Sequence, residues 1–480
     1  MLRRTRTWTA MAGGLLLVQG TVFGQTAPSD EPPDGPPDMA SQLKALQEEM
    51  RGLRRENDAM KGEIDELRAV TSDQWLTERR AEEIRGIVQD VLADADTRAS
   101  LLNDGLIAGW SDGFFLSSPD GRFRLTIGGQ MQARWVFNYH DQTDHYIQGF
   151  ENTRTKLIFG GHIINPDWEF RAQTNFDRDG GEALLEDAWI RHHLNNDVSI
   201  RFGQFKLPFT REFLVDSSRQ LAVERSLIDG AMNLGRSQGI EMTFSSSTAR
   251  FIAAFSDGAE DNMGQESGFN LAGTQPDPAN TSALTRDTEY AGTARYEVLV
   301  AGHWGQFDDL TSPQSDEFGM LIGAAIHTQE QEGGLPGPRE SRWFGWTADL
   351  SVEFGGANVF ASFTQHYLDE DGVDLFANIY GIVVQAGVYI TPKWEVFGRM
   401  EYGWTNFDLA NGTFERSDLL IFTFGANHYL DGHDLKWSSD IGFGASQVED
   451  FWINSRAGYR TDAEDAEPQI VIRTQIQLLF

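Results

Sequence analysis

Basic side chains recur at alternate positions in several segments of this chain. Six of them occupy the polar positions of stretches in which apolar and polar residues alternate: Arg124, Arg134, Arg154, Lys156, Arg171 and Arg201. A period of two places successive side chains on opposite faces of a β-strand, so these cations would share the polar face of one wall. In a narrow, partly dehydrated passage, such groups replace the hydration of a passing anion, and arginine suits phosphate-like oxygens. The pattern therefore predicts anion binding.

The stretch 206–235 continues this basic character. It contains Lys206, Arg211, Arg219 and Arg225, and Arg236 follows it directly. The same stretch carries eight large apolar residues: Leu207, Phe209, Phe213, Leu214, Leu221, Val223, Leu227 and Ile228. Loops that run over a surface in water are rarely so apolar. We expect this loop to fold into a lumen and pack on its wall, which would narrow the passage beside the cations.

Carboxylates near these cations leave a second interpretation open. Residues 122–236 hold 14 Lys and Arg against 15 Asp and Glu, whereas residues 237–480 hold 12 against 36. The acidic partners available to the cations are Glu169, Glu186, Asp187, Glu212, Asp216, Glu224 and Asp229. If these pair with the cations, the passage would have mixed charge and little selectivity. If they do not, the wall prefers anions.

Other chemistry has little support. The chain has no cysteine, which excludes disulfides and thiolate metal sites. Adjacent His192 and His193 would point to opposite faces of a strand and cannot share a metal, and the other histidines show no spacing typical of a catalytic base. The acidic run 369–374 lacks the distal Glu of a calcium loop. We expect no catalytic residue, metal or cofactor, and the net charge of -33 argues against nucleic acid as a partner.

Long alternating strands are the elements that would position the cations. We expect sixteen, near 123–139, 153–164, 167–177, 184–194, 197–205, 236–245, 249–256, 289–301, 317–327, 345–354, 357–367, 376–390, 393–402, 417–430, 434–443 and 469–480. The last one places Ile470, Ile472 and Ile476 opposite Arg473 and Gln475. An apolar face opposite a polar one suits a strand between lipid and water, although a half-buried strand of a soluble sheet has the same pattern.

The links between these strands favour the membrane interpretation. Short links near 165–166, 195–196, 246–247, 355–356, 391–392 and 431–433 alternate with long ones, which is typical of an outer-membrane barrel. The link 302–316 is long where a short turn is due, so the strand count could differ by two. A mean hydropathy of -0.39, with no long apolar run beyond the N-terminus, excludes a helical membrane protein. The predicted fold is an all-β, 16-stranded antiparallel transmembrane β-barrel over residues 111–480.

The N-terminal region has a different organisation. Residues 1–24 predict a signal peptide, with Arg3, Arg4 and Arg6 before a short apolar stretch, although an N-terminal anchor is the alternative. Residues 25–38 form a Pro-rich spacer, residues 39–74 a coiled coil and residues 75–110 a helical linker. We expect this stalk to lie in the periplasm.

The coiled-coil prediction depends on a heptad pattern. Apolar residues and Asn57 are spaced alternately by three and four: Leu43, Leu46, Met50, Leu53, Asn57, Met60, Ile64 and Leu67. Glu at the g positions and Arg or Lys at the following e positions favour a parallel coiled coil, and Asn57 would fix its register. A lone amphipathic helix that docks elsewhere is the alternative.

Four stretches resemble a known family. They are 113–116 (GFFL) with 123–130 (FRLTIGGQ), 153–157 (TRTKL), 186–190 (EDAWI) and 201–209 (RFGQFKLPF). In these the chain resembles the phosphate-selective porins O and P, and the pattern Gly-x-Phe-Lys-x-Pro at 203–208 is the most specific. The resemblance implies a homotrimer of sixteen-stranded outer-membrane barrels, an inward third loop between strands five and six, and a pore lined by lysines and arginines. Lys206 and the arginines above are the candidates for that lining.

The sequence therefore predicts an outer-membrane porin, not an enzyme. The first hypothesis is a passive channel for small anions such as phosphate, constricted by the loop 206–235. The alternative is a general porin for small hydrophilic solutes. In either case the coiled coil could space the outer membrane from the cell wall. The expected partners are outer-membrane lipid, two further copies of the chain, solutes in transit and the cell wall.

Overall fold

The computed structural model describes residues 39–72, 105–111, 113–140, 145–259, 282, 288–332, 340–370, 375–408, 414–453, 455–461 and 468–480. The chain divides into two units, Met1–Asp96 and Thr97–Phe480. The predicted signal peptide (1–24), the Pro-rich spacer (25–38), residues 73–74 of the predicted coiled coil and residues 75–104 of the predicted linker lie outside the described residues.

Helix α1, Met39–Ser72, is the described element of the first unit. Five apolar side chains at the predicted heptad positions between 46 and 64 are exposed, for example Leu46 (65%) and Leu53 (60%). This stripe therefore has no covering partner within the part of the chain that the structure describes. A coiled coil with further copies would cover it, and it stays a prediction. Among the described residues, no helix is both long and apolar enough to cross a membrane.

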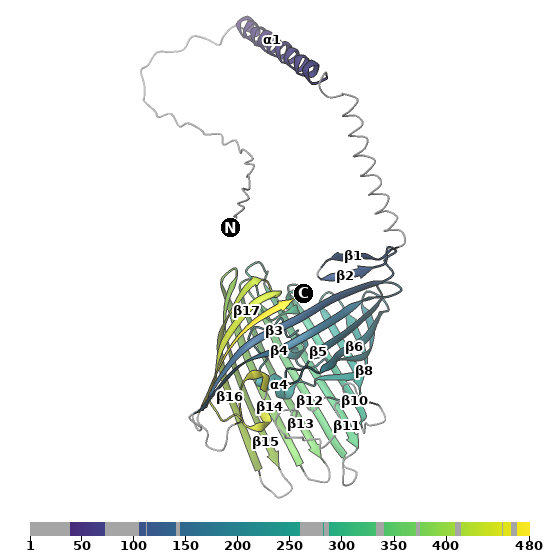
Figure 1. Ribbon diagram of the computed structural model, residues 1–480, viewed down its shortest axis with the longest axis vertical. Helices are drawn as coiled ribbons and strands as arrows, with labels where there is room; N and C mark the ends of the chain where they lie inside the picture. The colour runs from purple at the N-terminus through teal and green to yellow at the C-terminus, as the bar shows by residue number, and fades with distance from the viewer. Residues whose placement is uncertain are drawn as a thin grey trace, which may run out of the picture. The chain divides into compact units, whose positions relative to one another are not determined.

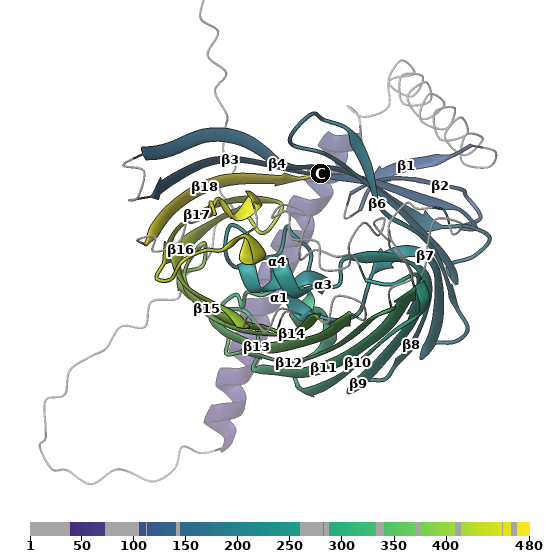
Figure 2. The ribbon, with the colours of Figure 1, turned by 90° about the horizontal axis from the view of Figure 1, so that it is seen from below.

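Sixteen antiparallel strands form a closed barrel in the second unit (Figures 1 and 2). They are β3 (Arg124–His140), β4 (His145–His162), β5 (Trp168–Phe176), β6 (Ala183–His193), β7 (Val198–Lys206), β8 (Arg236–Ser245), β9 (Ala249–Ser256), β10 (Thr288–Ala301), β11 (Gly319–Glu332), β12 (Glu340–Glu353), β13 (Ala357–Glu370), β14 (Leu375–Thr391), β15 (Trp394–Asp408), β16 (Phe414–Asp431), β17 (Leu435–Gly444) and β18 (Gln469–Leu479). Each pairs with the next, and β18 pairs with β3 from Gln469↔His140 to Leu479↔Gln130. The predicted sixteen-stranded barrel is confirmed.

Two short strands precede the barrel. β1 (Ile107–Trp110) pairs with β2 (Phe114–Ser117), and β2 extends the sheet beside the start of β3. The predicted helical linker is therefore wrong at 107–110. These residues alternate in exposure and find backbone partners in β2, which a helix would not allow. Figure 1 places β1 and β2 at the same end of the barrel as the C-terminus.

The two ends of the barrel differ in their links. At the short-turn end, most links are a few residues long, as at 246–248, 354–356 and 392–393. The opposite, long-loop end has the connections 207–235, 257–287 and 445–468. Several predicted long loops are shorter than expected, because their strands continue: β4 begins at His145, so its link with β3 is only 141–144. The long link 302–316 contains the 3-10 helix η3 (Trp304–Asp308) and no strand, so the count of sixteen holds.

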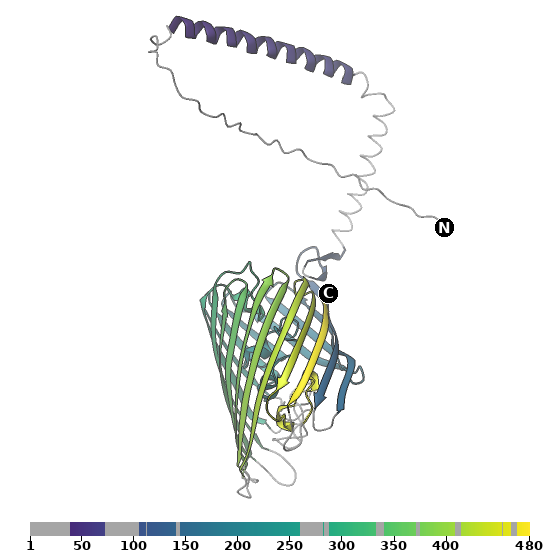
Figure 3. The same cartoon turned by 90° about the vertical axis from the view of Figure 1, so that its left-hand side faces the viewer.

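Strand parity separates the two faces of the wall. In β3 and β18, Gln132, Arg134 and Gln475 are buried, whereas Met131 and Ile476 are exposed. The strands lie side by side and tilted around the wall in Figure 3. Because buried polar side chains alternate with exposed apolar ones along each strand, the barrel has an apolar exterior and a polar interior, as a barrel in lipid requires.

The apolar core lies inside the lumen. The inward loop, residues 207–235, carries helices α3 (Arg211–Leu214) and α4 (Leu227–Met232), which Figure 2 shows within the ring of strands. Its apolar residues cluster with inward side chains of β13–β16 and with Phe451 and Trp452 of the link 445–468. Gly381 and Gly403 make this packing possible, since a Cβ at 403 would lie 2.5 Å from Trp452 and one at 381 would overlap Ile228. The loop therefore fills the side of the lumen next to β13–β16.

Candidate functional site

A cavity of about 300 Å³ remains between the inward loop and strands β4–β8. We call it the basic cavity, because its charged lining has eight basic and three acidic side chains among the described residues. The basic ones are Arg154, Lys156, Arg171, Arg201, Lys206, Arg225, Arg236 and Arg456, and the acidic ones are Glu186, Asp187 and Asp216. Phe213, Trp189 and Leu214 also line it. The alternation of β4, β5 and β7 turns Lys156, Arg171 and Arg201 inward, as predicted.

Three cations surround the ring of Phe213 in this cavity. Lys206 Nζ lies 4.9 Å from the ring centroid, Arg225 Cζ 5.2 Å and Arg236 Cζ 5.8 Å. Lys206 donates a hydrogen bond to the carbonyl oxygen of Phe213 (2.7 Å), and Arg225 donates to that of Val215 (2.9 Å). Carbonyl oxygens orient a cation without cancelling its charge. Positive charge therefore stays concentrated where the loop faces the wall.

Two carboxylates compensate part of this charge. Lys156 pairs with Glu186 (2.6 Å), and Arg236 pairs with Asp187 (2.9 Å) and Glu186 (3.4 Å). Arg171 is more open: its side chain is 33% exposed and lies 3.7 Å from Asp187. The basic cavity is thus neither free of carboxylates nor balanced by them.

Other predicted cations hold the inward loop in place. Glu224 of the loop accepts hydrogen bonds from Arg134 Nη2 (2.9 Å) and Arg154 Nη2 (2.5 Å). Arg211 donates to the Phe307 carbonyl oxygen and to Ser351 Oγ (3.1 Å). Arg134, Arg154 and Arg211 are buried, and their guanidinium groups donate hydrogen bonds to acceptors within the protein instead of to water. Arg154 also borders the basic cavity, with its charge already paired to Glu224, whereas Arg134 and Arg211 do not line that cavity.

Arg124 and Arg219 line neither this cavity nor its neighbour. Arg124 lies over the ring of Phe115 in β2, 4.2 Å from the centroid, at the short-turn end. Arg219 is exposed, and its carbonyl oxygen accepts a hydrogen bond from Leu310 N (3.3 Å). For these two residues the predicted role in anion binding has no support from their position.

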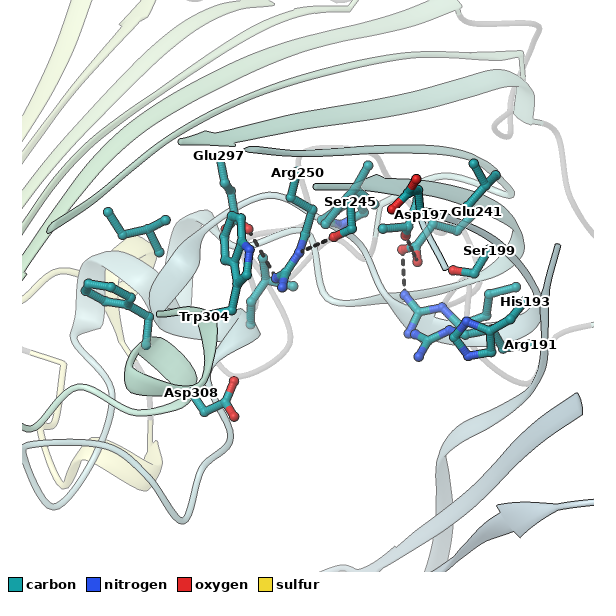
Figure 4. Close-up of a pocket in the computed structure, with 18 of the residues that line it drawn as sticks. Arg191, His193, Asp197, Ser199, Glu241, Ser245, Arg250, Glu297, Trp304 and Asp308 are labelled. Atoms are coloured by element: carbon teal, nitrogen blue, oxygen red, sulfur yellow. Dashed lines mark hydrogen bonds and ion pairs between the residues drawn. The ribbon is translucent and has the colours of Figure 1, made fainter. Parts of the chain in front are cut away.

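A second cavity of about 450 Å³ lies toward the short-turn end (Figure 4). We call it the mixed cavity, since its lining has four arginines and four carboxylates: Arg191, Arg201, Arg211, Arg250, Asp197, Glu241, Glu297 and Asp308. Arg201 pairs with Glu241 (2.5 Å) and Arg250 with Glu297 (3.3 Å). Arg201 and Leu214 line both cavities, so the two cavities are neighbours on either side of these side chains.

Several lining residues were missed from the sequence. Arg191 and Trp189 share the inward face of β6. The Arg191 guanidinium stacks on the Trp189 ring, with Cζ 4.8 Å from the ring centroid. The alternation of polar and apolar residues over 184–194 could have placed both side chains on the inward face. Arg250 is the second residue of β9 and lies on the face opposite the exposed Phe251 and Phe255, whereas Arg456 lies in a long link and has no pattern that points inward. Within the described ranges, no group of histidine and acidic side chains could hold a metal.

The charge state of the inward loop depends on its burial. Burial alone would raise the pKa of Asp216 and of Glu224, but neighbouring cations lower both: Lys206 for Asp216, Arg154 and Arg134 for Glu224. Asp229 of α4 differs, since burial and the nearby Glu212 carboxylate raise its pKa to about 7. The loop therefore carries ionised carboxylates at Asp216 and Glu224, of which Glu224 pairs with the basic wall, and a carboxyl at Asp229 that titrates near neutrality.

Three known proteins and one family model are similar to this chain. An uncharacterized protein of Aquifex aeolicus (strain VF5) is 26% identical over 261 residues, which cover 52% of this chain and 60% of that protein. The outer membrane channel DcaP of Acinetobacter baumannii has a TM-score of 0.50 at 11% identity, covering 78% of this chain and 100% of that one, and this likeness concerns the fold alone. An anion-selective porin from Comamonas acidovorans has a TM-score of 0.49 at 15% identity, covering 74% of this chain and 99% of that one. The family model described as "Phosphate-selective porin O and P" matches residues 125–295, which confirms the family resemblance that the sequence motifs predicted.

Proposed function

We propose that this protein is an outer-membrane porin through which small anions such as phosphate diffuse passively. The observation that carries the proposal is the basic cavity beside the inward loop, whose lining has eight basic and three acidic side chains. Two of the eight, Arg154 and Arg201, pair with Glu224 and Glu241 outside the lining, which leaves six cations against the three carboxylates. The match over residues 125–295 and the closed barrel support a channel rather than an enzyme. An anion entering the cavity would exchange water for guanidinium and ammonium donors.

The net charge of -33 does not contradict an anion path. The acidic half of the barrel carries its own buried arginines: Arg295 pairs with Asp349 (2.8 Å) and Arg473 with Asp440 (2.7 Å). The inward loop also packs over strands of that half. Since fields of exposed charges fall off within about 8 Å at physiological salt, a solute in the basic cavity responds mainly to the nearby cations.

A general porin for small hydrophilic solutes is the second candidate. The mixed cavity favours it, because pairs such as Arg201–Glu241 and Arg250–Glu297 present both signs of charge to a solute. In that case the basic cavity would concentrate anions without excluding neutral molecules. The two candidates differ in ion preference and in whether phosphate competes with chloride.

Reversal potentials of the purified protein in planar bilayers test the proposal. In a tenfold KCl gradient, ideal anion selectivity gives ~59 mV, and we expect the anion-selective sign with a smaller value. Adding phosphate should reduce the chloride current, since both anions would share the basic cavity. A cation-selective sign would overturn the proposal, and an anion preference with no effect of phosphate would favour the general porin.

Arg171→Gln is the matched variant for this test. Arg171 borders the basic cavity, and its polar contacts are with Gln173 and Asp187 of the wall, so the loop should stay docked. Its loss should shift the reversal potential toward zero. Arg342→Gln is the control, because that side chain is 55% exposed near the long-loop end of β12 and lines neither cavity.

We further propose that the protein is a homotrimer whose α1 helices form a parallel coiled coil in the periplasm and space the outer membrane from the cell wall. The exposed apolar stripe of α1 and its oppositely charged g and e positions support this role. Deleting residues 39–72 should lower the trimer yield and reduce the envelope spacing. Unchanged values of both would exclude the stalk role and leave the channel proposal untouched.

A further inference from the structure

The link 302–316 is unlike the other links at the short-turn end. It follows β10 and contains η3, and five of its residues are buried: Gln306 (6%), Phe307 (3%), Leu310 (4%), Thr311 (1%) and Ser312 (0%). A segment at the rim of a barrel buries side chains only by folding over the opening or into it. We call residues 302–316 the strap.

Contacts of the strap trace its course across the short-turn end. Their partners lie in the β8–β9 turn, the inward loop, the β12–β13 turn and the β16–β17 turn. The contacts are Trp304 Nε1 to Ser246 O (3.0 Å), Leu310 N to Arg219 O (3.3 Å), Gly356 N to Ser312 O (3.0 Å) and His433 Nε2 to Asp309 Oδ2 (3.4 Å). The strap therefore reaches from one side of the barrel to the other beneath the inward loop.

The strap also forms a wall of the mixed cavity (Figure 4). Trp304, Phe307 and Asp308 line the cavity from the strap, while Leu214 and Val215 line it from the inward loop. The mixed cavity thus lies between two inward segments. On the barrel wall, the Arg250 guanidinium stacks on the Trp304 ring with Cζ 4.2 Å from its centroid.

We propose that the strap is a second constriction, in series with the inward loop, and that solutes cross the short-turn end past Trp304, Arg250 and Asp308. This inference rests on the proposed channel function. The Trp304 ring is held by its hydrogen bond to Ser246 O and by Arg250, so it is a fixed part of the rim. In this arrangement the inward loop selects solutes by charge in the basic cavity. The strap limits their size in the mixed cavity, where the numbers of arginines and carboxylates are equal.

A single thiol tests whether the strap lines the path. Because the chain has no cysteine, Asp308→Cys introduces the only one. A bulky neutral methanethiosulfonate reagent added to a bilayer with the channel inserted should lower the single-channel conductance when it reacts there, because it narrows the path without adding charge. Asp167→Cys is the matched control: Asp167 is an exposed acid in the β4–β5 link at the same end and lines neither cavity. Its modification should leave the conductance unchanged.

Trp304→Ala tests the constriction itself. Removing the indole should raise the conductance on the order of 1.5-fold and admit larger polyethylene glycols from the short-turn end only, because the inward loop still limits entry from the long-loop end. Trp394→Ala is the control, since Trp394 stacks on His428 at another link of the same end (4.3 Å between centroids) and lines neither cavity. Trp304→Phe keeps a ring at the rim and should keep the wild-type size limit.

The outcomes separate this inference from the porin proposal. If the wild-type protein does not conduct, the porin proposal itself fails. If it conducts, but thiol modification at 308 leaves the current unchanged and Trp304→Ala keeps the wild-type size limit from both ends, then the strap lies beside the path and our inference is overturned. A current lowered by modification at 308, together with a larger size limit from the short-turn end, supports it.

Discussion

Replacing Glu224 by glutamine should release the inward loop from the basic wall without opening the barrel. Glu224 is buried (4% exposed), and its two oxygens bind Arg134 and Arg154, which belong to β3 and β4. Its carbonyl oxygen also accepts from Arg399 on the opposite side of the lumen (2.8 Å). The substitution keeps the shape and one acceptor, but removes the charge that compensates two buried guanidinium groups.

The expected cost follows from that loss of charge. Removing one partner of a buried ion pair costs about 3–5 kcal/mol. Arg134 keeps Gln475 Oε1 (2.9 Å) and Val223 O (3.2 Å) as acceptors, which places the cost near the lower value. At 1.4 kcal/mol per tenfold change, about 3 kcal/mol raises the undocked fraction of the loop roughly 100-fold. The strand ladders do not include Glu224, so the barrel should stay closed.

Hydrogen exchange of backbone amides measures this local opening. Amides of α4 that bond within the loop, such as Gly230 and Asn233, should exchange roughly 100-fold faster in Glu224→Gln, while amides of β14 and β15 keep their rates. Glu169→Gln is the control, because its carboxylate is 38% exposed and its pair with Arg191 contributes less than about 1 kcal/mol. An acceleration of less than about fivefold would refute the reasoning and assign the docking to apolar packing.

Two further perturbations test the same loop. Docking should weaken as pH rises from about 4 to 7, because the pKa of Asp229 is raised from 3.8 to about 7 by burial and Glu212, so the docked loop keeps a proton that the undocked loop releases. Exchange of loop amides should accelerate across this range in the wild type, beyond the intrinsic pH dependence, and not in Asp229→Asn; equal profiles would contradict this. Gly381→Val would place methyl groups against Ile228 and Met232 and should destabilise docking by about 1–3 kcal/mol. Gly292→Val, where a Cβ meets nothing within 4 Å, should not, and similar exchange in both variants would count against the packing argument.

The positions of the strands could be predicted, because the alternation of apolar and polar residues that indicates a strand lies within the sequence of that strand. All sixteen barrel strands were expected from it, and the largest differences lie at their ends, as at His145, where β4 begins in a polar stretch beyond the expected membrane band. Beyond the apolar band, a strand continues because it pairs with its neighbour. Its sequence there needs no alternation of apolar and polar residues, so these strand ends could not be predicted. The strand β1 was missed for a related reason, since four residues are too few to show a period.

The ion pairs of the cations could not be predicted from the sequence. Parity placed Lys156, Arg171 and Arg201 on the inward face, yet it could not say which cations would be compensated. Glu224 lies 70 residues from Arg154 and 90 from Arg134, and only the docking of the loop brings them together. A charge that looks available along the sequence can thus be a buried anchor in the fold.

The distribution of charge in the barrel follows from where the inward loop packs. Its apolar residues bind the half of the lumen next to β13–β16, where glycines such as Gly381 leave room for α4. That choice covers carboxylates that already have buried arginine partners, and it leaves the wall with Arg171, Arg201 and Arg236 facing the remaining space. An acidic chain can therefore enclose a locally basic passage.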